Sequence, residues 1–259
     1  MTLLKNLFDL SGRTAIVTGG SRGLGLQIAE ALGEYGAQIA LVARKRSELE
    51  EAVQNLAGQG IKAAAFDADL SSAGVTTELV ERIAAHFGRI DILVNNAGAT
   101  WGAAAEEYPI EGWDKVINVN LTAVFTLTQA VARHSFLPNQ GGVVINVASI
   151  EGLLGHHHSR LGTVAYNAAK GGVISLTRAL AAEWGHRNIR INALAPGFFP
   201  SKMTAVTVRE HGDEMIRQTP LGKLGNENDI KGAALLLASD ASGHITGQTI
   251  IVDGGASII

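Results

Sequence analysis

The 259-residue sequence contains no cysteine, which excludes disulfide bonds, thiolate zinc sites and a cysteine nucleophile. It also lacks any run of about 18 apolar residues, so a membrane-spanning helix is not expected. The formal net charge is only -3 and no basic stripe is present, which argues against nucleic acid as a partner.

A secretion signal is not expected either. In the first residues, MTLLKNLFDLSGR, Lys5 and Asp9 interrupt the apolar positions, and no small-residue cleavage site follows. We therefore expect a cytoplasmic protein. Hydrophobic residues make up 46% of the chain and charged residues 17%, so we expect a packed core rather than disorder.

Glycine is abundant, and its first cluster separates a predicted strand from a predicted helix. Residues 15–17 form a short apolar run, and residues 24–32 place apolar side chains at helical spacing. Between them Gly19, Gly23 and Gly25 follow the pattern T-G-x-x-x-G-x-G rather than G-x-G-x-x-G. Strand, turn and helix in this order favour a bound pyrophosphate, because backbone N–H groups and the positive end of the helix dipole meet there. A tight turn without a ligand is the alternative.

The end of the second predicted strand, residues 37–44, indicates which dinucleotide is bound. In Rossmann units an acid at this point selects a free ribose 2′-hydroxyl, and an arginine accommodates a 2′-phosphate. Here the strand ends in Arg44-Lys45 with no acid, and Arg22 in the glycine turn is expected to reach the same phosphate. We predict NADP(H) rather than NAD(H). Alternatively, Arg44 and Lys45 are solvated residues that start a helix.

Strands and helices alternate along the rest of the chain. This alternation predicts an α/β fold, a single Rossmann-like domain over residues 1–259 with one doubly wound parallel sheet of about seven strands and helices on both faces. The further strands are expected at residues 62–70, 90–94, 142–148, 189–195 and within 244–255, and the further helices at 76–87, 110–133 and 227–239.

Tyr166 and Lys170 carry the strongest chemical signal. On a helix their side chains stand one turn apart on the same face. A free tyrosine has a pKa near 10, and an ammonium within about 4 to 6 Å lowers that value, so we expect Lys170 to make Tyr166 a usable acid or base. Ser149 follows the strand at 142–148, at the sheet edge where doubly wound folds bind ligands.

These motifs stand in the order found in short-chain dehydrogenase/reductases. The glycine turn, N-N-A-G at residues 95–98, Ser149, the Y-x-x-x-K pair, P-G at 196–197 and D-G-G at 253–255 resemble that family over nearly the whole chain. The sequence is similar to bacterial 3-oxoacyl-(acyl-carrier-protein) reductases and to gluconate 5-dehydrogenase-like members. The resemblance implies an enzyme that transfers hydride between NADP(H) and a small-molecule ketone or secondary alcohol. A homotetramer or homodimer is the assembly it implies.

The resemblance also assigns roles to individual residues. Tyr166 is expected to give the carbonyl oxygen its proton, Ser149 to hydrogen-bond that oxygen, and Lys170 to bind the nicotinamide ribose. The backbone carbonyl of Asn120 is expected to hold a water in the proton path, although a buried asparagine bonded within a locally bent helix fits the same position. The residues expected at the cofactor are Thr18, Gly19, Ser21, Arg22, Gly23, Leu24, Gly25, Arg44, Asp69, Leu70, Asn96, Ala97, Gly98, Tyr166, Lys170, Pro196, Gly197 and Ser201.

Two of those assignments have alternatives. Asp69 matches the acid that contacts adenine in the family, and it also suits a loop or helix-capping aspartate. Ser201 stands near the usual threonine that bonds the nicotinamide carboxamide, although the preceding residues 198–200, Phe-Phe-Pro, differ from the commoner polar sequence.

Residues 197–225 are expected to form a mobile, partly helical lid over the substrate. The apolar residues there favour a 3-oxoacyl or other hydrophobic carbonyl substrate over a sugar acid or polyol of the gluconate 5-dehydrogenase type. Trp101 and Tyr108 either line the substrate cleft or pack under it. The apolar lid residues are Met203, Val206, Val208, Met215 and Ile216. A non-catalytic NADP(H) sensor is the alternative of a different class, and the retained Asn-Ser-Tyr-Lys set argues against it.

His156, His157 and His158 lengthen the segment between Ser149 and Tyr166. We interpret them as a solvated loop and predict no metal site, since consecutive side chains of a loop diverge. The alternatives are a cleft lip that contacts an anionic group when protonated, and a weak metal site.

Overall fold

Seven parallel strands form one sheet in the order β3-β2-β1-β4-β5-β6-β7 in the computed structural model, which describes residues 3–72, 74–155, 162–202 and 204–259. The order reverses direction between β1 and β4, the arrangement of a doubly wound fold. The predicted fold class is confirmed. The strands are β1 (Thr14–Thr18), β2 (Gln38–Ala43), β3 (Ala63–Asp67), β4 (Ile92–Asn95), β5 (Gly142–Val147), β6 (Ile189–Pro196) and β7 (Thr249–Val252).

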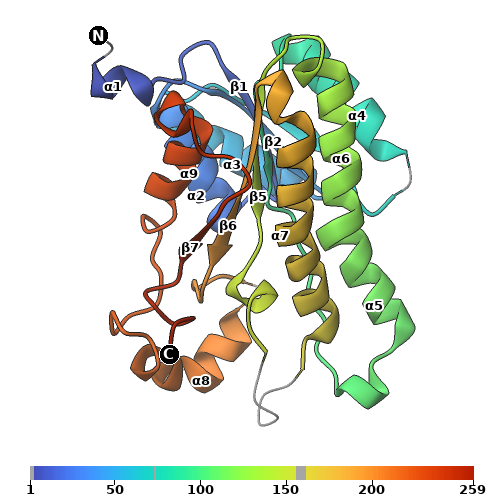
Figure 1. The fold of residues 1–259 in the computed structure, drawn as a ribbon, viewed down its shortest axis with the longest axis vertical. Helices are drawn as coiled ribbons and strands as arrows, with labels where there is room; N and C mark the ends of the chain where they lie inside the picture. Colours follow the sequence, from blue (N-terminus) through green and yellow to red (C-terminus); the bar gives the residue numbers. More distant parts are fainter. Residues whose placement is uncertain (1–2, 73, 156–161, 203) are drawn as a thin grey trace.

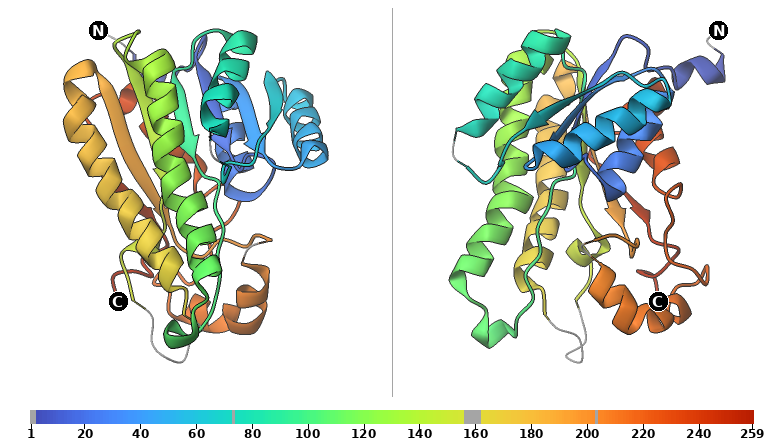
Figure 2. Two further views of the ribbon diagram at one scale, coloured as in Figure 1. Left: turned by 90° about the vertical axis from the view of Figure 1, so that its right-hand side faces the viewer. Right: turned by 180° about the vertical axis from the view of Figure 1, so that it is seen from behind.

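Helices cover both faces of the sheet (Figures 1 and 2). One layer contains α2, α3 and α9, and the other contains α4, α6 and α7. The α-helices are α1 (Leu4–Leu7), α2 (Gly23–Glu34), α3 (Arg46–Gly58), α4 (Val75–Phe87), α5 (Ile110–Ile117), α6 (Ala123–Val131), α7 (Val164–Trp184), α8 (Ala205–Arg217) and α9 (Lys231–Ala238). None of the helices within the described ranges is long and apolar enough to cross a membrane.

The strands are apolar on both sides because both sides are covered. Ala15 and Val17 of β1 belong to the core under α2, α3 and α9, whereas Ile16 between them belongs to the core under α4, α6 and α7. All five residues of β1 are buried. This is the near-continuous hydrophobic run that a central parallel strand requires.

Some boundaries differ from those that the sequence predicts. The third strand was expected to continue to Asp69-Leu70, and it ends at Asp67. The chain turns there because the Asp69 carboxylate accepts hydrogen bonds from both the backbone N–H and the hydroxyl of Ser71. The helical region 110–133 is continuous, but a π-helical turn over Asn118–Thr122 interrupts its α-helical pattern.

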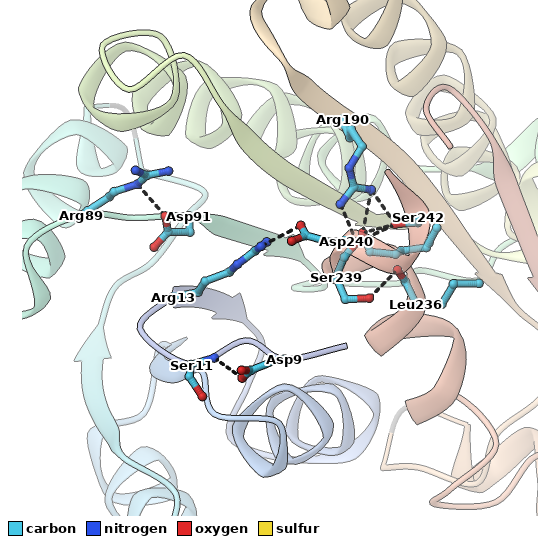
Figure 3. Close-up of polar contacts among 11 residues, drawn as sticks. Asp9, Ser11, Arg13, Arg89, Asp91, Arg190, Leu236, Ser239, Asp240 and Ser242 are labelled. Carbon is cyan, nitrogen blue, oxygen red and sulfur yellow. Dashed lines mark hydrogen bonds and ion pairs between the residues drawn. The ribbon is translucent and has the colours of Figure 1, made fainter. Parts of the chain in front are cut away.

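Polar contacts hold the amino-terminal ends of the strands (Figure 3). Arg13, just before β1, pairs with Asp240 at 2.7 Å, and Arg190 in β6 donates to the Ser242 hydroxyl at 2.6 Å and to the Ser239 carbonyl at 2.9 Å. The carboxyl ends of the strands lie at the opposite edge, where α8 is located (Figure 1). The predicted catalytic residues lie at this second edge.

Candidate active site

Three of the predicted catalytic side chains meet at the carboxyl end of β5. Tyr166 and Lys170 lie one turn apart on α7, and Ser149 stands close enough to the Tyr166 hydroxyl to lower its pKa. The Lys170 ammonium lies 5.5 Å from the centroid of the Tyr166 ring. It donates a hydrogen bond to the Val147 carbonyl at 2.7 Å, which ties α7 to the end of β5. The structure therefore brings together the Ser-Tyr-Lys set that the spacing predicts.

The pKa of Tyr166 shifts in the direction opposite to the prediction. Burial raises it to about 12 and outweighs the lowering effect of the nearby Ser149. The ring packs beside Val116, Ala165 and Ala169, which explains the desolvation. The Lys170 side chain is only 3% exposed, and burial lowers its pKa to about 8. The expected lowering of the Tyr166 pKa by Lys170 is thus wrong for this structure, because desolvation dominates both groups.

Asn120, the fourth member of the predicted set, is fully buried in the π-helical turn. Its side-chain amide donates to the carbonyls of Ala99 at 2.7 Å and Val116 at 2.8 Å, and its oxygen accepts from the Ala99 N–H at 3.3 Å. The side chain therefore joins the helix to the segment after β4. These contacts match the asparagine bonded within a locally bent helix, and they leave the proposed role of its backbone carbonyl untouched.

Gly152 and Asn167 position this site, and neither was predicted from the sequence. A Cβ atom on Gly152 would lie 2.6 Å from the Lys170 carbonyl carbon and 2.7 Å from the Gly171 nitrogen, so only glycine lets the segment after Ser149 approach α7. Asn167 donates to the carbonyl of Glu151 at 2.8 Å and to that of Leu154 at 3.2 Å. The signals available were S-x-x-G after the strand and an asparagine directly following Tyr166.

The glycine turn has the shape of a cradle for a dinucleotide. Gly19 and Gly23 have φ values of +64° and +55°, in the left-handed region that favours glycine. A Cβ atom on Gly25 would collide with the Gly19 carbonyl oxygen. Helix α2 begins at Gly23, and no side chain caps its first N–H groups. These observations fit the pyrophosphate that the motif predicts, with Ser21 and Leu24 on the same turn.

Thr18 and the N-N-A-G segment hold this cradle in place. The Thr18 hydroxyl accepts hydrogen bonds from the backbone N–H groups of Asn96 and Ala97, both at 2.9 Å. The Asn96 side chain donates to the Thr18 carbonyl at 2.9 Å. Thr18 is 1% exposed, and its side chain positions the turn. Gly98 lies against Asn120, because a Cβ atom there would be 2.8 Å from the Asn120 side-chain oxygen.

A series of buried side-chain hydrogen bonds, here called the buried polar ladder, joins the ends of β4 and β5 to the helices that pack on them. The Asn95 amide donates to the Thr128 hydroxyl and to the Asn146 side-chain oxygen, both at 2.9 Å. The Asn146 amide then donates to the Thr177 hydroxyl at 2.9 Å. Since Thr128 lies on α6 and Thr177 on α7, the ladder connects two strands and two helices under the site.

The two arginines predicted to hold a 2′-phosphate have different surroundings. The Arg22 guanidinium pairs with the Glu48 carboxylate at 2.7 Å, and Lys45 donates to the same carboxylate at 3.1 Å. Arg44 is exposed, and its charge contributes to the lowered pKa of Asp69. The acid beside these cations, Glu48 in the first turn of α3, was not predicted from the sequence.

The remaining predicted cofactor residues lie at the same edge or just beside it. Asp69 forms the loop contact with Ser71 described above, and Leu70 packs partly buried against the core of α4 and α6. Pro196 ends β6, and the Gly197 N–H donates to the Val252 carbonyl at 3.0 Å. A Cβ atom on Gly23 would lie 4.0 Å from the Ser201 Cβ, so Ser201 stands beside the glycine turn.

The predicted lid contains α8, and not all apolar side chains of this helix are exposed to solvent. Met215 is 3% exposed, whereas Arg209, Glu210 and Asp213 on the same helix are exposed. Ile216 is 36% exposed. The side chains of Met203 and Val206 lie outside the described residues, and so do His156, His157 and His158. The part of the lid that is described is therefore more polar on its surface than the composition suggested.

Trp101 and Tyr108 pack under α5. The Tyr108 hydroxyl donates to the Trp101 carbonyl at 3.0 Å, and both rings contact the small core around Val116. A Cβ atom on Gly112 of α5 would lie 2.9 Å from the Trp101 ring. Of the two roles left open for these rings, the contacts support packing.

Comparison with known proteins agrees with this geometry. A family model described as enoyl-(acyl carrier protein) reductase matches residues 19–257. Gluconate 5-dehydrogenase of Gluconobacter oxydans (strain 621H) is 39% identical over 255 residues, covering 98% of each chain. The 3-oxoacyl-(acyl-carrier-protein) reductase FabG of Chlamydia trachomatis is 39% identical over 247 residues, covering 95% of this chain and 98% of that protein. A crystal structure of a gluconate 5-dehydrogenase from Burkholderia cenocepacia J2315, in complex with NADP and tartrate, has a TM-score of 0.93 and 34% identity, covering 99% of this chain and 100% of the other.

Proposed function

The chain belongs to the short-chain dehydrogenase/reductase family, and on that premise we propose that it is an NADP(H)-dependent oxidoreductase that interconverts a ketone and a secondary alcohol. The observation that carries the proposal is the placement of Ser149 beside the Tyr166 hydroxyl, with the Lys170 ammonium 5.5 Å from the centroid of the Tyr166 ring. This set and the glycine turn both lie at the carboxyl edge of the sheet.

The residues of the chain supply proton transfer and orientation. NADPH, when bound, supplies the hydride that the carbonyl carbon receives. Ser149 hydrogen-bonds the carbonyl oxygen, and the Tyr166 hydroxyl gives that oxygen its proton as the alcohol forms. Because burial keeps the pKa of Tyr166 near 12, the phenol is protonated at neutral pH and ready to act as an acid. Ketone reduction is the direction we propose, with NADPH as the cellular hydride donor. Asn120 is assigned to the proton path through its backbone carbonyl.

NADP(H) is the cofactor we propose, held by the residues named above from Thr18 to Ser201. Arg22 and Lys45 share the Glu48 carboxylate, and the exposed Arg44 precedes Lys45 in the chain. These three cations support a site for the 2′-phosphate, which accepts charge-assisted hydrogen bonds. NADP in the Burkholderia relative supports the same choice.

The substrate class with most support is a 3-oxoacyl or other hydrophobic ketone. Leu153 and Leu154, which follow Ser149, are 43% and 36% exposed, and Val164 at the start of α7 is 37% exposed. These apolar side chains flank the catalytic residues in the chain and suit an apolar substrate. The FabG relative supports this class.

A sugar acid is the second candidate. The charged outer surface of α8 and the burial of Met215 favour a polar substrate, as do the two gluconate 5-dehydrogenase relatives. We further propose that residues 1–259 form a single domain with residues 197–225 as its lid. A homotetramer or homodimer fits the exposed Phe125 on α6 and Trp113 on α5.

Titration with NADPH and NADH, followed by a ketone panel, tests these assignments. The nicotinamide fluorescence of each cofactor reports binding, and its loss on addition of 3-oxoacyl thioesters, 5-ketogluconate or simple cyclic ketones reports turnover. We expect tighter binding of NADPH and oxidation by one ketone class. Tighter binding of NADH would contradict the NADP(H) assignment, and bound NADPH that no ketone oxidises would contradict the assigned reaction.

A further inference from the structure

Glu48 stands among the cations that are expected to recognise the cofactor. Its two carboxylate oxygens are used separately, one by Arg22 at 2.7 Å and the other by Lys45 at 3.1 Å. The contact with Arg22 connects the glycine turn to α3 across 26 positions of the chain. Glu48 is the more protected partner, with 27% of its side chain exposed against 53% for Arg22 and 66% for Lys45.

The position of this carboxylate has a chemical consequence. In Rossmann units an acid near the second strand accepts hydrogen bonds from a free 2′-hydroxyl, and a basic residue there binds a 2′-phosphate. This chain carries both kinds of group at one place. A phosphate that approaches Arg22 for a forked interaction meets a guanidinium nitrogen already bonded to Glu48, and it meets the negative charge of that carboxylate.

We propose that Glu48 is a specificity-determining residue whose carboxylate competes with the 2′-phosphate of NADP(H) for Arg22 and Lys45. Because of this competition, the affinity for NADP(H) exceeds that for NAD(H) by less than it would if the cations were present without Glu48. Because the ion pairs are partly exposed, each is weak and the incoming phosphate displaces them at modest cost. The inference rests on the proposed NADP(H) function and adds the residue that limits its selectivity.

Equilibrium binding to the intact protein tests the proposal. The dissociation constants of NADPH, NADH and adenosine 2′,5′-bisphosphate are measured for the wild type and for Glu48→Gln. We expect Glu48→Gln to bind NADPH and the bisphosphate about three- to tenfold more tightly, because the competing charge is gone. NADH, which lacks the 2′-phosphate, should change less than twofold.

Glu50→Gln is the matched control. Glu50 lies on the same helix and forms an ion pair with Arg46 at 2.8 Å, so the variant removes an equal charge without touching Arg22. It should leave all three constants within twofold of the wild type. In an Arg22→Gln background, the effect of Glu48→Gln should shrink, since one of the two contested cations is absent.

Other outcomes would overturn the proposal. Unchanged NADPH binding in Glu48→Gln would mean that the carboxylate is a bystander, and weaker binding would mean that it orients Arg22 for the phosphate. Equal tightening of NADPH and NADH would remove the link to the 2′-phosphate. These results leave the proposed function intact, whereas a wild type that binds neither dinucleotide would overturn that function and this inference together.

Discussion

Replacing Lys170 by methionine should change how the stability of the protein depends on pH. The ammonium is buried, with its hydrogen bond to the Val147 carbonyl, and burial lowers its pKa to about 8 from the ordinary 10.5. The folded protein therefore binds fewer protons than the unfolded chain between these two values. The free energy of unfolding of the wild type must then rise with pH in this window, and a methionine removes the effect.

The size of the effect follows from the two pKa values. A shift of one unit corresponds to about 1.4 kcal/mol, so the whole window contributes roughly 3 kcal/mol. Between about pH 7.5 and 9.5, the free energy of unfolding of the wild type should rise by about 2 kcal/mol relative to that of Lys170→Met. Ionisation of Tyr166 in the unfolded chain begins near the upper limit, but it occurs in both proteins and cancels.

Urea unfolding of the two proteins at steps from about pH 7 to 9.5 measures this difference. The exposed Lys62 supplies the control, because Lys62→Met should keep the pH dependence of the wild type. If the free energy of unfolding of the wild type, relative to that of Lys170→Met, stayed constant or fell as the pH rises, the proposed lowering of the Lys170 pKa by burial would be refuted. That result would show that the folded protein does not desolvate the ammonium.

Two further substitutions test the support of the site. Gly152→Ala should lower the free energy of unfolding by roughly 1 to 3 kcal/mol and reduce turnover, because the new Cβ atom meets the α7 backbone. Gly58→Ala is the control, since a Cβ atom there meets open space. Equal denaturation midpoints and activities for the two variants would count against a tight approach of Gly152 to α7. Asn146→Ala should lower the free energy of unfolding by roughly 2 to 4 kcal/mol, because it leaves an Asn95 N–H buried without its acceptor. The control Asn55→Ala, on the exposed face of α3, should lower it by less than about 0.5 kcal/mol. Similar losses for the two variants in urea unfolding would argue against the buried polar ladder.

Much of this architecture follows from local patterns. The buried strand before Gly19 and the helix after it were predictable because apolar periodicity and glycine spacing are local properties of the chain. The helix that places Tyr166 and Lys170 on one face was predictable for the same reason. The end of β3 was not, because the turn depends on where Asp69 finds its hydrogen-bond donors.

The site itself depends on contacts between distant segments. Glu48 reaches Arg22 only because α3 packs beside the glycine turn, and Gly152 matters only because α7 returns against it. The pKa of Tyr166 illustrates the same limit. The i, i+4 spacing correctly predicts a neighbouring ammonium, but the desolvation that dominates the pKa comes from the packing of α5 and α7 around the ring.

Turnover and NADPH binding of Tyr166→Phe, measured on the same preparation, test the central claim most directly. The variant removes the hydroxyl that gives the carbonyl oxygen its proton and leaves the glycine turn unchanged. We predict that kcat for the preferred ketone falls by about two to four orders of magnitude while the dissociation constant of NADPH stays within about threefold. Turnover close to that of the wild type would contradict the assignment of Tyr166 as the proton donor.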